Sequence, residues 1–181
     1  MANDGLPDGY AVGLNQNTYW SIGVLLEDNV SLKSSGGDIF MAGSMGPTSG
    51  SWLGHIVTER GTVIDSGSGR IAMWGRALSG TTSDNQGIAL HHAGDGGGVG
   101  YATGMISSDA SSSDAISIYS DSRAAPSCSR GITAYWHGPN LSGWRQGVQI
   151  LATRAGGGIS LTGLASSSTN CNGQVWGVNL E

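Results

Sequence analysis

The chain has 181 residues, of which 12% are charged, 38% are hydrophobic and 32 are glycines. Charged residues occur at about half their usual share and glycines at more than twice theirs, which disfavours a fold of solvated helices. The net charge of −5 with a single lysine excludes a nucleic-acid binder, because such proteins need a basic surface. No run of about 18 apolar residues exists, so no membrane insertion is expected.

Glycine and serine are also typical of disordered linkers, but six tryptophans and recurrent isoleucine, valine and leucine can supply a core. Residues 1–19 are turn-rich around a short predicted strand at 10–14, and they form either an N-terminal partial coil or a frayed end. Residues 20–181 are predicted to form one repeat domain. With no signal peptide at its start, we interpret the chain as a piece of a larger protein.

From residue 20 the sequence repeats itself with a period of 32 residues. Segment 37–43 (GDIFMAG) returns as segment 69–75 (GRIAMWG), and the same shift aligns Trp20 with Trp52. Self-similarity at a fixed period over this length is typical of solenoids and other repeat arrays.

The central motif of the repeat occurs four times, at Ile39, Ile71, Ile116 and Ile159, which are 32, 45 and 43 residues apart. Each copy has apolar residues at positions i and i+2, the period of a half-buried strand. We therefore expect vertical stacks of inward side chains and a matching set of outward ones. The inward set is Ile39, Met41, Ile71, Met73, Ile116, Ile118, Ile159 and Leu161, and the outward set is Phe40, Ala72, Ser117 and Ser160.

Three short strands are predicted in each repeat. They span 22–26, 30–32 and 39–41 in the first and 56–57, 62–64 and 71–73 in the second, and later repeats start near 88, 132 and 178. The predicted fold is all-β: a right-handed parallel β-helix of about four coils, because going once round the coil supplies the long connection that parallel strands need. Segments 91–98, 107–114 and 136–146 are expected to be exposed loops outside the common cross-section.

Few residues suggest catalytic or metal chemistry. His91, His92 and Asp95 are metal-ligand types, but adjacent histidines on a strand point to opposite faces, which favours a solvated loop. No serine sits in a Gly-x-Ser-x-Gly elbow after a strand. We expect no cofactor and no metal. The carboxylates that could approach one another across coils are Asp38, Asp65, Asp114 and Asp121, and nothing selects a pair of them.

Charged and aromatic residues at repeat positions suggest contacts between coils. Asp38 aligns with Arg70 under the 32-residue shift, which predicts a surface ion pair. The aligned Trp20 and Trp52 predict an aromatic ladder. Trp136 and Trp144 are the candidate ligand contacts, because they lie on a long excursion where an aromatic ring either packs the loop down or stacks on a sugar.

The two cysteines have matching places in the last two repeats. Cys128 lies 12 residues after Ile116, and Cys171 lies 12 residues after Ile159. If the intervening turns have the same shape, the cysteines lie on adjacent coils about 4.8 Å apart, within the Cα range of disulfides. The alternatives are a Cys128–Cys171 disulfide and two unpaired thiols.

The glycine-flanked motifs resemble a known class of repeat. Segments 36–43 (GGDIFMAG) and 157–163 (GGISLTG), the latter followed by GVNL at 177–180, resemble repeats of filamentous-haemagglutinin-like and autotransporter passenger domains. The resemblance implies a secreted or surface-displayed bacterial adhesin shaft. Such a shaft is not an enzyme, and its loops contact a glycan or a host or neighbouring-cell surface. The alternatives are a carbohydrate-active β-helix, such as a polysaccharide lyase, a hydrolase or a phage tailspike fragment, and a carbohydrate-binding module that uses Trp136 and Trp144.

Overall fold

The structure, a computed structural model, describes ten segments of the chain. They are residues 11–13, 20–27, 29–45, 52–59, 61–77, 87–93, 104–125, 129–137, 148–166 and 176–180. Within these segments the chain forms strands and turns without a helix. The predicted all-β fold is therefore confirmed.

The strands follow one another in cycles of three. Coil 1 contains β2 (Trp20–Leu26), β3 (Ser31–Lys33) and β4 (Ile39–Met45), and coil 2 contains β5 (Trp52–Thr58), β6 (Val63–Asp65) and β7 (Ile71–Arg76). Coil 3 contains β8 (Ile88–Ala93), β9 (Met105–Ser108) and β10 (Ile116–Asp121), and coil 4 contains β11 (Ile132–His137), β12 (Gln149–Ala152) and β13 (Ile159–Leu164). The strand β1 (Ala11–Gly13) precedes coil 1, and β14 (Val178–Leu180) follows coil 4.

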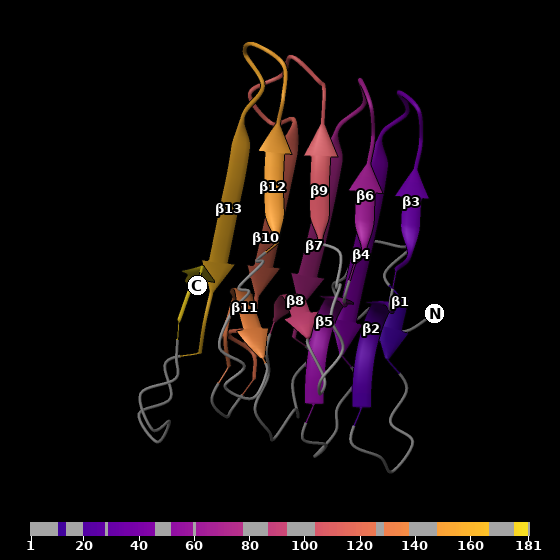
Figure 1. The fold of residues 1–181 in the computed structure, drawn as a ribbon. Helices are drawn as coiled ribbons and strands as arrows, with labels where there is room; N and C mark the ends of the chain where they lie inside the picture. Colours follow the sequence, from indigo (N-terminus) through magenta and orange to yellow (C-terminus); the bar gives the residue numbers. More distant parts are fainter. Residues whose placement is uncertain are drawn as a thin grey trace, which may run out of the picture.

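Equivalent strands of successive coils pair in parallel and build three sheets. Sheet A has the order β1-β4-β7-β10-β13, sheet B the order β14-β11-β8-β5-β2, and sheet C the order β12-β9-β6-β3. The coils lie side by side along one axis, from β3 and β4 at the indigo end to β12 and β13 at the orange end (Figure 1). This is the parallel β-helix that the sequence predicts, with three strands per coil.

The core consists of five rows of inward side chains that run in register from coil to coil. The rows are Val24–Ile56–Ile88–Ile132, Leu26–Thr58–Leu90–Ala134, Leu32–Ile64–Ile106–Ile150, Ile39–Ile71–Ile116–Ile159 and Met41–Met73–Ile118–Leu161. Ile71, Met73 and Ile116 are fully buried. The predicted stacks and their register are confirmed.

The row that begins at Ile39 loses its cover at its last member. Ile159 is 44% exposed, because β13 is the edge strand of sheet A as the structure describes it. At the opposite end, β1 pairs with β4 at the usual 32-residue offset, Ala11 with Gly43. Residues 11–13 therefore occupy the place of the last strand of a preceding coil.

Coils 3 and 4 are longer than coils 1 and 2, yet they keep the register. Ile56 and Ile64 are 8 residues apart, whereas Ile88 and Ile106 are 18 apart and so are Ile132 and Ile150. Each later coil thus accommodates ten additional residues between its first and second strands. This agrees with the principle that a longer loop adds little entropic cost.

The predicted bounds of the exposed loops were wrong at three places. His91 and His92 belong to β8 and pair with Tyr135 and Trp136 of β11, so these residues continue the ladder instead of starting a loop. Segment 107–114 also begins within a strand, because Ser107 lies in β9. The rest of the first and third predicted loops, 94–98 and 138–146, lies outside the described residues.

Segment 107–114 was mistaken for a fully exposed loop because of its serines. Ser108 and Ala110 are buried, at 1% and 6% exposure. The Ser108 hydroxyl donates to the Gly69 carbonyl oxygen at 2.7 Å and accepts from the Ala110 N–H at 3.1 Å. A serine whose hydroxyl is bonded in this way can be buried at little cost, which composition alone does not reveal.

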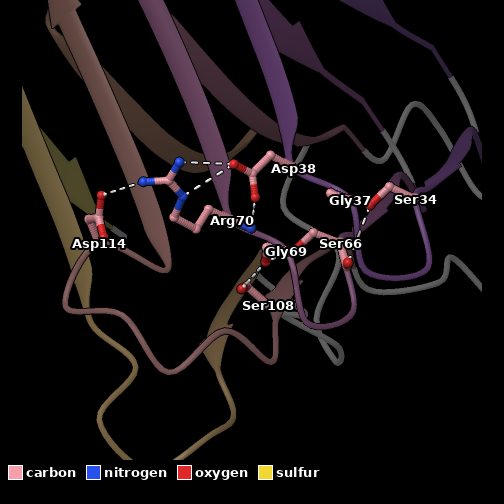
Figure 2. A network of polar contacts seen from close by, with 8 residues as sticks. All are labelled: Ser34, Gly37, Asp38, Ser66, Gly69, Arg70, Ser108 and Asp114. Atoms are coloured by element: carbon pink, nitrogen blue, oxygen red, sulfur yellow. Dashed lines mark hydrogen bonds and ion pairs between the residues drawn. The ribbon is translucent and has the colours of Figure 1, made fainter.

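A ladder of serines closes the corner between sheets C and A. The Ser34 hydroxyl donates to the Gly37 carbonyl oxygen, and the Ser66 and Ser108 hydroxyls donate to that of Gly69 at 2.6 and 2.7 Å (Figure 2). These bonds join neighbouring coils as well as neighbouring residues, so they fix the direction in which each chain segment enters sheet A.

The two turns of coil 1 use residues that coil 2 replaces with glycine. Gly61 and Gly67 have φ of 64° and 58°, in the left-handed region where glycine is favoured. The equivalent Asn29 and Ser35, 32 residues earlier, adopt φ of 59° and 56°. The repeat therefore conserves the turn conformation even where it does not conserve the residue.

Candidate functional site

The outward face of sheet A carries three large exposed aromatic side chains. Phe40, Trp74 and Tyr119 come from β4, β7 and β10 and are 57%, 38% and 37% exposed. They alternate along their strands with the buried methionine and isoleucine rows, so the pleat of the sheet directs them to solvent. We call these three residues the aromatic strip.

The members of the aromatic strip are close enough to act together. Trp74 and Tyr119 are register partners on adjacent strands. Phe40 contacts Trp74 edge to face, with ring centroids 5.3 Å apart and an angle of 83° between the rings. This is a favoured geometry for aromatic pairs and holds both rings in place. Neighbouring exposed rings of this kind are typical of interaction surfaces in soluble proteins.

A charged cluster borders the strip where the strands of sheet A begin. The Arg70 guanidinium lies 2.9 Å from Asp38 and 3.3 Å from Asp114, between the two carboxylates (Figure 2). The Arg70 backbone N–H also donates to Asp38 at 2.8 Å, and chiefly this bond lowers the pKa of the Asp38 carboxyl. The predicted Asp38–Arg70 ion pair is confirmed, and its exposure makes it a weak source of stability.

A second charged cluster borders the strip where the strands end. Asp121 accepts from Arg123 at 2.7 Å, and chiefly this bond lowers the pKa of the Asp121 carboxyl. Arg76 is the register partner of Asp121. An open depression of about 330 Å³ is lined by Arg76, Ala77, Asp121, Arg123 and Ala124.

The two clusters balance each other in charge. Together they hold three aspartates and three arginines, Asp38, Asp114 and Asp121 with Arg70, Arg76 and Arg123. The charges of these six residues therefore sum to zero, although the whole chain carries a net charge of −5.

A buried histidine is the described residue closest to a catalytic arrangement. His55 of β5 is fully buried, and its Nε2 lies 3.0 Å from the hydroxyl oxygen of Ser122. Its ring occupies space left by Gly75 of sheet A, where a Cβ atom would lie 2.7 Å from the His55 Cβ. Burial lowers the pKa of His55 to about 3, so the imidazole is neutral at neutral pH.

The His55–Ser122 pair has the residue types of an activated nucleophile but not its setting. A catalytic serine needs access to substrate and a base oriented by a third group. Ser122 is fully buried, and the Nδ1 atom of His55 has no hydrogen-bond partner among the described residues. We therefore assign this pair to packing between sheets A and B.

The other predicted site residues do not converge. Trp136 lies in β11 in register with His92, and its side chain is outside what the structure describes. Trp144, Asp95 and both cysteines also lie outside the described residues. Within the described ranges no group of three potential metal ligands is found. In the same ranges no helix is long and apolar enough to cross a membrane.

The four predicted carboxylates are each bonded to an arginine or a backbone N–H. Asp38 and Asp114 lie on either side of Arg70, and Asp121 is bonded to Arg123. Asp65 accepts from the Gly67 N–H at 3.0 Å in the corner turn. Asp38 and Asp114 thus share one arginine, whereas Asp65 and Asp121 have separate partners.

The disulfide prediction assumes that the turns of coils 3 and 4 have the same shape, which would keep residues near Cys128 paired with residues 43 positions later. A contact next to Cys128 has a different offset. Ser129, next to Cys128, exchanges hydrogen bonds with Ser166, which lies 37 residues later, not 43. The Cys128–Cys171 disulfide remains a prediction.

Sequence reasoning missed the aromatic strip, although a signal was present. Phe40 was correctly predicted to point outward, together with Ala72 and Ser117. Trp74 lies two residues after Ala72 and Tyr119 two residues after Ser117, so both point outward as well. Large aromatic residues at outward positions of successive repeats are the pattern that identifies such a strip.

Comparison with known proteins adds no further guide: no family model, no curated protein and no solved structure matches the chain. Its function is therefore argued from the geometry above.

Proposed function

We propose that the chain is a structural stalk segment of a secreted or cell-surface bacterial adhesin, which displays its loops and outer faces at a distance from the cell. The observation that carries the proposal is the unbroken register of the five core rows through the coils. In a solenoid each coil stacks only on its neighbours, so the same contacts repeat along one axis and produce an extended, stiff body.

The extracellular part of the proposal rests on the resemblance to haemagglutinin-like repeats. Segments 36–43 and 157–163, which carry that resemblance, occupy equivalent places in the coil. Each runs from the corner turn into the first residues of a sheet A strand, β4 or β13. Their glycines therefore serve one recurring structural purpose, as the repeats of a shaft would require.

The proposed role is not enzymatic. The pair of residues nearest to a catalytic arrangement, His55 and Ser122, is enclosed by the core, where a polysaccharide cannot reach it. A polysaccharide lyase or hydrolase is the alternative. An assay for new reducing ends or unsaturated ends, with the purified chain and a panel of polysaccharides, tests it: sustained product release would contradict the stalk proposal.

The mechanical role is tested by pulling the chain between its ends in single-molecule force spectroscopy. We expect stepwise unfolding in which each step releases one coil. A coil of 32 to 45 residues corresponds to an extension of roughly 105–160 Å. If the whole chain extended without steps of this size, the proposal that each coil bears load and unfolds separately would be contradicted.

The location is tested with an antibody raised against the purified chain. We expect labelling of intact, unpermeabilised cells of the source organism. Labelling that requires permeabilisation would contradict display at the surface.

A further inference from the structure

We infer that the outward face of sheet A binds a neutral polysaccharide, with sugar rings packed on the aromatic strip and sugar hydroxyls bonded to the two charged clusters. This goes beyond the stalk proposal, since a shaft needs no ligand on its side.

The aromatic strip supplies the surface on which a sugar ring packs. The faces of a pyranose ring present C–H groups, which are apolar, while its hydroxyls project from the edge. Such a ring fits an exposed aromatic face better than it fits a charged surface. Phe40 and Trp74 already hold each other edge to face, so little side-chain freedom is lost on binding.

The charged clusters supply hydrogen-bond partners on both sides of the strip. Arg70 directly precedes β7 and Arg76 ends it, so they lie at opposite margins, six residues apart, which corresponds to about 20 Å along the strand. Carboxylates accept and guanidinium groups donate in fixed planes, so both classes of sugar hydroxyl contact are available. The depression lined by Asp121 and Arg123 begins two residues beyond Tyr119 and provides a recess for one sugar unit of the polysaccharide.

The balance of charge selects a neutral ligand. Each aspartate of the two clusters has an arginine neighbour, and the six charges cancel. An anionic polymer would need arginines in excess of carboxylates, and a cationic one the reverse. The face as a whole therefore offers no excess of either sign to attract a charged polymer, and a neutral saccharide does not need one.

The direction of the strip suggests how the polysaccharide lies. Phe40, Trp74 and Tyr119 belong to successive strands β4, β7 and β10, which are about 4.8 Å apart. A linear polysaccharide laid along the solenoid axis therefore meets one aromatic ring in each of coils 1 to 3, and we expect it to cross the strands of sheet A.

The inference is tested by affinity gel electrophoresis and calorimetry with the purified chain. The neutral probes are hydroxyethyl cellulose, laminarin, xyloglucan, galactomannan and dextran, and the anionic probes are polygalacturonate and heparin. We expect at least one neutral probe to bind, with a Kd that changes less than twofold between 50 and 500 mM NaCl, because no net charge is exchanged. No binding to any neutral probe, or salt-sensitive binding to the anionic probes alone, would overturn the inference.

Variants locate the binding on sheet A. Trp74→Ala and Tyr119→Ala should each weaken binding about tenfold. Asp121→Asn should weaken it less, because one margin and the strip stay in place. The matched control is Leu151→Ala, which removes a side chain that is 38% exposed on β12 of sheet C, outside the strip. Circular dichroism and thermal melting confirm that each variant is folded.

Two results would assign the face differently. Equal loss of binding in Leu151→Ala and Trp74→Ala would place the ligand elsewhere. Sedimentation showing a dimer of the native chain that Trp74→Ala converts to a monomer would assign the strip to a second copy of the chain. Neither result bears on the stalk proposal, which the pulling experiment tests through coil stacking.

Discussion

The buried histidine predicts a specific loss of stability in mild acid. The pKa of His55 is about 3 in the folded chain, against an ordinary value of 6.5. Between these values the unfolded chain binds one proton more than the folded chain, so the free energy of unfolding falls as the pH falls. The slope is about 1.4 kcal/mol per pH unit. Lowering the pH from 7.5 to 4.5 should therefore cost about 3 kcal/mol, most of it below pH 6.5.

The carboxylates of Asp38 and Asp121 titrate below the range from pH 7.5 to 4.5. The pKa values of Asp38 and Asp121 are lowered from 3.8 by their arginine partners. A group with a lowered pKa contributes stability that is present above its unfolded value and is lost as the pH falls through its folded value. Their contribution therefore disappears mainly below pH 4, which separates it from that of His55.

Urea unfolding at pH 7.5, 6.5, 5.5 and 4.5 measures the effect, with His55→Gln as the comparison. The variant keeps every other titrating group, so the difference between the two pH profiles isolates His55. We expect the native chain to lose about 3 kcal/mol more than the variant over this range. Parallel profiles would refute the reasoning. So would an NMR titration in which the His55 ring becomes protonated near pH 6.5.

Three further predictions concern packing and covalent structure. Ile71→Ala should cost about 2–5 kcal/mol in urea unfolding, whereas Ile159→Ala in the same row should cost less than half as much because Ile159 is 44% exposed; equal costs would contradict the stack. Gly75→Ala should cost about 1–3 kcal/mol, because its Cβ would meet the His55 side chain at 2.7 Å; an unchanged midpoint would contradict the close approach of the sheets. Mass spectrometry of the unreduced, thiol-blocked chain should show a Cys128–Cys171 bridge worth about 4 kcal/mol in the chain-entropy treatment, and two alkylated cysteines would contradict it.

The core could be predicted from the sequence because its signal is both local and repeated. Alternation at Ile39 and Met41 specifies which side chains point inward, and the 32-residue offset specifies which of them stack. Neither step needs information about the rest of the fold.

The ends of strands and the candidate site were not predictable in this way. Ser108 is polar and lies in a serine-rich segment, yet a carbonyl oxygen of the preceding coil makes its burial favourable. The aromatic strip likewise depends on contacts between coils. Trp74 and Tyr119 lie three residues after Ile71 and Ile116, so the predicted stack already places them side by side, but the exposure of the two rings is seen only in the folded chain.

The two longer coils share one offset, and the shorter coils share another. Ile88 and Ile132 are register partners 44 residues apart, and so are Ile106 and Ile150. The first two coils instead keep an offset of 32. The register is thus tied to the strands and not to the length of the connections. A coil of this fold can therefore lengthen one connection without altering the contacts that stack the coils.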